Sequence, residues 1–68
     1  MINKLKELRV AQGLTQKQVG EKVGVSRQAI NAIETGKFEP SIWLAYDLSR
    51  LFEMSIEDLF DFERSERR

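Results

Sequence analysis

The feature that most restricts the fold of this chain is a three-residue joint between two short helical segments. Thr15 and Gln18 have the spacing of a capping box, which starts a helix at residue 15. A glycine ends that helix and a serine caps the next, so only Gly24, Val25 and Ser26 connect the two. A glycine-containing turn of this length predicts two short helices that cross at a steep angle.

The remaining boundary signals predict three further helical segments, giving five. Asn3 is a candidate cap for the first segment, and Gly13 marks the turn that ends it. Pro40 cannot continue a helix, and Ser41 is a favourable cap for the fourth segment. The run that begins at Ser55 opens a short fifth segment. The apolar positions predicted to face the core are Leu5, Leu8, Ala11, Val19, Val23, Ile30, Ile33, Ile42, Ala45, Leu48, Phe52, Ile56 and Leu59.

Gly20 lies inside the second predicted helix, where glycine costs about 0.5–1 kcal/mol relative to alanine. Close approach of the third helix at the crossing would explain this glycine. A tolerated weak position in the helix is the alternative. We favour the packing explanation because Gly20 lies near Val19 and Val23, on the side that faces inward.

The length and composition of the chain limit the function classes that suit it. Its 68 residues predict a single domain over residues 1–68 with a thin core. Without histidine or cysteine, the commonest general base and metal ligands are missing, so we expect no enzyme, cofactor, metal or small-molecule substrate. No apolar run approaches the roughly 20 residues that cross a bilayer, and the N-terminus is unlike a signal peptide. A soluble, cytoplasmic protein with no membrane partner is therefore expected.

The net charge is zero, but the charges are unevenly distributed along the chain. Residues 1–40 hold seven basic and four acidic side chains, and residues 41–68 hold four basic and seven acidic ones. Such a dipole could present one face to phosphate and another to solvent or a partner, with ordinary solvated charge as the alternative. The charged tail over residues 61–68 is predicted to fray. Phe60 and Phe62 alternate with acidic residues, which allows a short C-terminal strand.

The third predicted helix carries an unusual polar face. Successive helical residues turn by about 100°, which places Arg27, Gln28, Asn31, Ala32 and Thr35 within an arc of roughly 140°. Solvated helix faces usually mix glutamate and lysine, whereas this arc contains no acid. Its side chains match base edges instead: arginine pairs with guanine, glutamine or asparagine with adenine, and a methyl group contacts the thymine methyl. The pattern favours base recognition in the major groove over a merely solvated surface.

Phosphate contacts are predicted on both sides of this face. Thr15 and Gln16 begin the second helix, where free backbone N–H groups and the helix dipole favour a phosphate. Lys17 and Lys37 would add salt-dependent contacts, although each lysine could equally be ordinary surface. Thr35, at the end of the third helix, is the remaining predicted phosphate contact.

Glu34 lies beside the apolar side of the third helix rather than in the polar arc. A carboxylate near DNA is repelled unless it is paired. We therefore predict a structural ion pair between Glu34 and Arg9 of the first helix, which would fix the third helix in place. Independent solvation of the two side chains is the alternative.

Taken together, these positions resemble a known family. The matching residues are Thr15-Gln16, Val19-Gly20, Gly24-Val25-Ser26, Ile30, Ile33-Glu34, Gly36 and Pro40. They resemble the signature of the Cro/C1-type helix-turn-helix family, the lambda-repressor-like domains, over about residues 4–60. The chain is most similar to the short, single-domain members, including the cytolysin-repressor-like regulators, which are homodimers.

The resemblance implies an all-α, five-helix DNA-binding domain whose helix-turn-helix, helices 2 and 3, spans about residues 15–35. It implies that the third helix lies in the major groove of double-stranded DNA. The side chains at base-recognising positions would be Arg27, Gln28, Asn31 and Ala32. Gln16 would contact a phosphate and support the neighbouring base-recognising residue. Arg9 with Glu34 matches a structural ion pair of the family. In the short dimeric members the chain after the fifth helix can form a small strand, which suits Phe60 and Phe62.

Two positions depart from the family pattern. Glu53 stands at the end of the fourth helix, where glycine or asparagine is common. If the backbone is left-handed there, it carries strain of order 1 kcal/mol or more. Trp43 stands where a polar residue is common, and it could lie near the DNA backbone or at a subunit contact.

These observations predict a sequence-specific transcriptional regulator, most simply a repressor that binds a near-palindromic operator as a homodimer. Surplus apolar groups in the C-terminal part suggest a dimer interface that includes Leu51, Phe60 and Phe62, with plain core as the alternative. The alternative function is an antitoxin-like module that binds a protein partner through its acidic C-terminal half.

Overall fold

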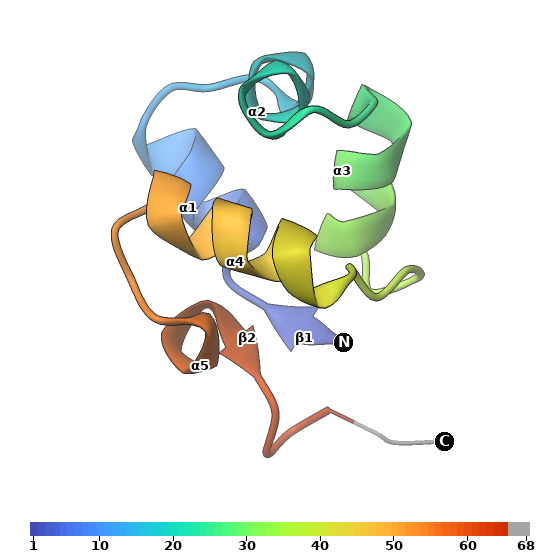
Figure 1. Ribbon diagram of the computed structural model, residues 1–68, viewed down its shortest axis with the longest axis vertical. Helices are drawn as coiled ribbons and strands as arrows, with labels where there is room; N and C mark the ends of the chain where they lie inside the picture. Colours follow the sequence, from blue (N-terminus) through green and yellow to red (C-terminus); the bar gives the residue numbers. More distant parts are fainter. Residues whose placement is uncertain (66–68) are drawn as a thin grey trace.

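The computed structural model describes residues 1–65 and contains five helices and a small sheet within that range (Figure 1). The elements are β1 (Ile2–Asn3), α1 (Leu5–Ala11), α2 (Gln16–Val23), α3 (Arg27–Glu34), α4 (Ile42–Leu51), α5 (Ile56–Leu59) and β2 (Phe60–Asp61). The five predicted helices and the short C-terminal strand are confirmed. Across the described residues, no helix is long and apolar enough to cross a bilayer. The C-terminal part of the predicted charged tail, residues 66–68, lies outside the described residues.

Hydroxyl caps start four of the five helices. In each case the cap oxygen accepts the backbone N–H of the third helical residue, which satisfies one of the free donors at the helix end. These caps are Thr15, Ser26, Ser41 and Ser55. Thr15 and Gln18 form the complete capping box. The first helix differs, since it begins at Leu5, whose N–H donates to Asn3 Oδ1 at 3.0 Å.

The two strands join the ends of the described chain. β1 pairs with β2 in antiparallel register, with Ile2 opposite Asp61 and Asn3 opposite Phe60. Figure 1 places this sheet and α5 at the end of the molecule away from α2. The N-terminal strand was not predicted, because two residues carry no recognisable alternation and their pairing depends on a partner almost 60 positions away.

The core collects apolar side chains from all five helices and β2. Its buried apolar members are Leu5, Val19, Ile30, Ile33, Ala45, Leu48, Phe52, Leu59 and Phe60. Two predicted core positions are wrong: Ile42 is 69% exposed, and Ala11 is also exposed. Ile42 occupies the first turn of α4, and the side of that helix that packs inward is defined by Ala45 and Leu48 instead.

The structure also corrects the predicted dimer contacts. Phe60 is 1% exposed and belongs to the core, so it cannot contact a second subunit in this fold. Its place opposite Asn3 in the sheet directs it inward. Leu51 is half-buried and packs against the core, while Phe62 remains exposed. Of the three residues, Phe62 alone is exposed, at 45%.

Helix α4 ends on a left-handed residue that is not glycine. Glu53 has φ 56° and donates its N–H to the Arg50 carbonyl, while Met54 N–H donates to the Ser49 carbonyl. These two bonds form a Schellman motif, in which glycine is favoured because it has no Cβ to strain. The left-handed backbone that the sequence analysis considered at Glu53 is therefore present, and with it the expected strain.

Replacing Glu53 with glycine is expected to raise the free energy of unfolding by about 0.5–1 kcal/mol, because relief of Cβ strain exceeds the added freedom of the unfolded chain. Urea unfolding followed by circular dichroism measures the change. Glu21→Gly is the matched control, since Glu21 is exposed inside α2 with ordinary helical geometry. That variant should lose about 1 kcal/mol. A Glu53→Gly protein no more stable than the parent would contradict the account.

Candidate nucleic-acid interface

One face of α3 is free for contact with another molecule. Ile30 and Ile33 on the opposite side are fully buried and anchor the helix. Three of the predicted base-recognising side chains, Arg27, Gln28 and Asn31, are exposed. None of these three side chains forms a hydrogen bond or ion pair with a residue between 1 and 65. The face therefore presents one guanidinium and two side-chain amides that are not engaged in polar contacts with any residue from 1 to 65.

The other two residues of the arc are more constrained. Ala32 is half-buried, so its methyl group is less accessible to solvent than the three exposed side chains. Thr35 is exposed, but its hydroxyl donates to the carbonyl of Asn31 at 3.0 Å and lies 3.3 Å from that of Ala32. A phosphate contact through this hydroxyl proton would have to replace those bonds.

The corner between α2 and α3 depends on the absence of a side chain at Gly20. A Cβ built there would lie 2.5 Å from the carbonyl oxygen of Val25 and 3.3 Å from backbone atoms of Ser26. Val25 N–H donates to the Gly20 carbonyl at 2.9 Å, which ties the turn to α2. Gly24 completes the turn with φ 78°. The close-approach explanation for Gly20 is confirmed.

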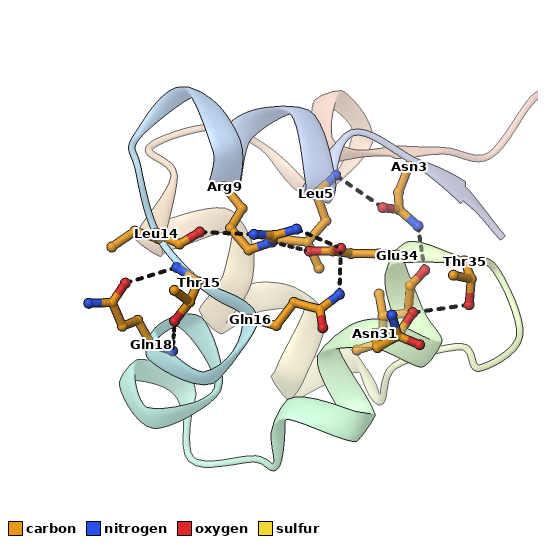
Figure 2. A network of polar contacts seen from close by, with 11 residues as sticks. Asn3, Leu5, Arg9, Leu14, Thr15, Gln16, Gln18, Asn31, Glu34 and Thr35 are labelled. Atoms are coloured by element: carbon orange, nitrogen blue, oxygen red, sulfur yellow. Dashed lines mark hydrogen bonds and ion pairs between the residues drawn. The ribbon is translucent and has the colours of Figure 1, made fainter.

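A buried ion pair fixes α3 relative to α1 (Figure 2). Arg9 Nε lies 2.6 Å from Glu34 Oε2, and Arg9 Nη2 donates to Oε1 at 3.2 Å. The two side chains are 12% and 2% exposed, respectively. Arg9 Nη1 also donates to the Leu14 carbonyl at 2.9 Å, so the pair holds the loop before α2 as well. Two-point contact between a guanidinium and a carboxylate gives the pair a defined geometry.

Gln16 joins this network from the start of α2. Its side-chain nitrogen donates to Glu34 Oε1 at 3.0 Å, as Figure 2 shows. This contact was not predicted from the sequence, for which Gln16 contacts a phosphate and supports the neighbouring base-recognising residue. A further donor to Glu34 could have been predicted, because a buried carboxylate that accepts from one arginine still has free acceptor positions. Gln16 thus connects the phosphate-facing end of α2 with α3.

The N-terminal segment holds the C-terminal end of α3. Asn3 Nδ2 donates to the Ile33 carbonyl at 2.9 Å and to the Met1 carbonyl at 3.0 Å. Its Oδ1 accepts from Leu5, so one side chain connects β1, α1 and α3 (Figure 2). Sequence reasoning gave Asn3 only the capping role, since the contact to α3 spans thirty positions.

The N-terminus of α2 borders a shallow, positively charged hollow. The first two backbone N–H groups of α2, at Gln16 and Lys17, precede the capped N–H of Gln18 and have no intrahelical partner. Lys17 and Arg27 line the hollow, and no acidic residue between positions 1 and 65 lines it. The remaining lining residues are Arg9, Gly13, Leu14, Thr15 and Gln16. A helix N-terminus with nearby cations favours an anion such as a phosphate.

Lys37 lies on the other side of the α3 face. It is exposed and follows Gly36, whose φ of 77° turns the chain away from α3. Its backbone N–H donates to the Ala32 carbonyl at 2.9 Å, which fixes the position of the residue while leaving the ammonium group in solvent. The exposed cations Lys17, Arg27 and Lys37 therefore lie before, on and after the exposed side of α3, respectively.

The comparisons with known proteins agree with this geometry. The helix-turn-helix family model matches residues 5–59. An HTH-type transcriptional regulator of Methanocaldococcus jannaschii is 48% identical over 66 residues, covering 97% of this chain and all of the relative. The regulator YgzD of Bacillus subtilis is 48% identical over 63 residues, covering 93% and 96% of the two chains.

A solved structure extends the agreement to three dimensions. The P22 c2 repressor, crystallised in complex with a synthetic operator, superposes with a TM-score of 0.82 at 28% identity, covering 85% of this chain and 88% of the crystallised repressor chain. With a family model over most of its length, this chain belongs to the Cro/C1-type helix-turn-helix family and is a DNA-binding transcriptional regulator.

Proposed function

We propose that this regulator is a sequence-specific repressor that binds a near-palindromic operator as a homodimer, with α3 in the major groove. The observation that carries the proposal is the free face of α3, where Arg27, Gln28 and Asn31 are exposed, acid-free and uncommitted to any residue of the range 1–65. A helix fits the width of the major groove, and the N-terminal residues of a recognition helix contact base edges. Its site of action would be the cytoplasm.

The side chains of α3 suit different bases. Arg27 offers two parallel donors to O6 and N7 of a guanine. Gln28 and Asn31 each offer a donor and an acceptor, which suits N6 and N7 of an adenine. Ala32, half-buried on the same face, suits contact with a thymine methyl group. The operator half-site would accordingly contain at least one guanine and one adenine in the major groove.

Backbone and lysine groups would position the domain on the DNA. We assign the free N–H groups at the start of α2, with Thr15, Gln16 and Lys17, to one phosphate strand and Lys37, with Thr35, to the other side of the groove. The side-chain nitrogen of Gln16 is engaged with Glu34, so its phosphate contact is assigned to its backbone N–H. These contacts would make binding weaken steeply with salt.

The repressor and dimer assignments draw support from the fold. The P22 c2 repressor, which shares it, was crystallised on an operator. In such dimers the two recognition helices occupy successive major grooves about 34 Å apart, which requires two half-sites related by two-fold symmetry. A dimer bound in this way would block access of RNA polymerase to an overlapping promoter.

Arg27→Ala is expected to weaken binding to the selected site by about 10- to 100-fold, or roughly 1–3 kcal/mol, and to relax the preferred base at one position. The site is first selected from random oligonucleotides with the parent protein. Fluorescence anisotropy then compares this site with a scrambled duplex at fixed salt.

The matched control is Lys37→Ala, which removes one exposed cation beside the same helix. It should weaken binding to both duplexes by the same factor, since phosphate contacts carry no sequence information. An Arg27→Ala protein that loses affinity equally for both duplexes would contradict the base-recognising role.

A further inference from the structure

An apolar surface lies directly after α3. It consists of Phe38, Ile42, Trp43 and Tyr46, which are 49%, 69%, 73% and 44% exposed. We call these four residues the α4 face, because three of them lie on the first two turns of that helix. Isolated exposed apolar residues are ordinary, but a contiguous group on one helix marks a contact surface.

The geometry of α4 gathers these side chains on one side. With about 100° between successive residues, Ile42, Trp43 and Tyr46 fall within an arc of roughly 100°, opposite the buried Leu48. The rings of Trp43 and Tyr46 meet edge to face, with centroids 6.3 Å apart and planes at 87°. The Arg50 guanidinium lies 6.0 Å from the Tyr46 ring centre. The rings are thus already held in position, which reduces the entropy lost on association.

The size of the α4 face suits a contact between two copies. From the exposed fractions, it presents roughly 400–500 Å² of apolar side chain, taking about 150–250 Å² for a whole aromatic residue. Mutual coverage of the face by a second copy would bury roughly 800–1,000 Å² of apolar surface, and with the polar rim that surrounds such a contact it reaches the lower end of the sizes of specific interfaces.

The charge distribution favours self-association here and opposes it at the C-terminal end. Glu39 is the only charged residue from position 38 to 46. The surface of α5 and β2 instead carries Glu57 and Asp58, while Asp61 is paired with Arg64 and Glu63 lies between those two in the chain. In a two-fold contact the same surface meets itself, so an acidic surface would face like charge.

We infer that the α4 face is the surface through which two copies of this chain associate; the inference deepens the proposed homodimer and depends on it. Phe38 follows the last residue of α3 by four positions, so contact here would bring the C-terminal ends of the two recognition helices toward each other. The molecule measures 30 × 22 × 20 Å, and two such bodies side by side can separate their α3 helices by about one DNA turn.

Cysteine cross-linking tests the contact directly, since the chain contains no cysteine. Ile42→Cys, treated with a short bis-maleimide, is expected to form a covalent dimer in high yield that still binds the selected operator. Val10→Cys is the matched control, because Val10 is a 59% exposed apolar residue on α1. Equal cross-linking of the two variants would overturn the inference.

Charge insertion provides the complementary test. Ile42→Glu is expected to raise the dimer dissociation constant by about 100-fold in sedimentation equilibrium, while Val10→Glu and Phe62→Glu leave it within a few-fold of the parent. Thermal melting at high concentration shows that each variant is folded. If Phe62→Glu dissociates the dimer while the Ile42→Glu protein remains dimeric, the α4 face is not the dimer contact. The proposed homodimer itself would still stand.

Two other outcomes separate the inference from the proposed function. If Ile42→Glu stays dimeric but binds DNA less tightly, the α4 face is a DNA contact and the inference is wrong. A parent protein that is monomeric at every concentration, with and without operator, overturns both the α4 contact and the homodimer. Base recognition is judged separately by the Arg27→Ala comparison, which does not require a dimer.

Discussion

Arg9→Ala is expected to lower the free energy of unfolding by about 3–5 kcal/mol, because it leaves the buried Glu34 carboxylate without its charged partner. Gln16 keeps one hydrogen bond to that carboxylate, but a single amide does not replace a guanidinium with two contacts. A domain of this length has a total stability of roughly 3–10 kcal/mol. The variant is therefore expected to be largely unfolded at 37 °C.

Urea unfolding at low temperature, followed by circular dichroism, measures this loss. Arg64→Ala is the control ion-pair variant, since Arg64 is 73% exposed and its nitrogen lies 3.6 Å from Asp61. It should change stability by less than about 0.5 kcal/mol, as exposed pairs contribute little. Equal losses in the two variants would show that the Arg9–Glu34 pair is solvated in solution.

A double substitution separates the cost of an orphaned charge from the contribution of the pair. Arg9→Met with Glu34→Leu removes both charges while keeping much of the buried volume, and should be less destabilising than Arg9→Ala alone. Its affinity for the selected operator should nevertheless fall, because the pair and Gln16 fix α3 relative to the start of α2. Stability and DNA binding would then separate in one protein.

The local features of this fold were predictable because their signals lie close together in the chain. Serine and threonine caps, and glycines at the turns, mark helix boundaries through contacts within four residues. The helical pattern likewise predicted the exposure of Arg27, Gln28 and Asn31. Placing Glu34 off the polar arc was enough to suggest a partner for its charge.

The residues whose burial or role was predicted wrongly or missed depend on contacts between parts of the chain that are distant in sequence. Ile42 fits the apolar periodicity of α4, but it is the first residue of that helix and lies in solvent, while Leu44 and Ala45 in the same turn pack on the core. Phe60 becomes buried because β1, which is too short to recognise, pairs with its strand. The role of Asn3 in holding α3 has the same origin, since its acceptor is a backbone carbonyl thirty residues away.

Gly20→Ala is expected to destabilise the protein by about 2–3 kcal/mol, although alanine is intrinsically better in a helix by about 0.5–1 kcal/mol. The added methyl group would lie 2.5 Å from the Val25 carbonyl oxygen, so α2 and the turn must move apart. Both obstructing residues, Val25 and Ser26, contribute backbone atoms, which cannot rotate away as a side chain would. The strain therefore falls on the corner that sets the position of α3.

This corner links stability to DNA recognition, so the same variant has a second expected effect. If α3 shifts on its core contacts, Arg27 and Gln28 lose their alignment with base edges, and affinity for the selected operator should fall more than affinity for a scrambled duplex. Anisotropy at a temperature where the variant is folded measures both affinities. Glu21→Ala, at the neighbouring exposed position of α2, controls for a change in helix propensity and should leave both nearly unchanged. A Gly20→Ala protein as stable as the parent, with normal discrimination between duplexes, would show that the corner yields without cost and that α3 is positioned chiefly by its ion pair.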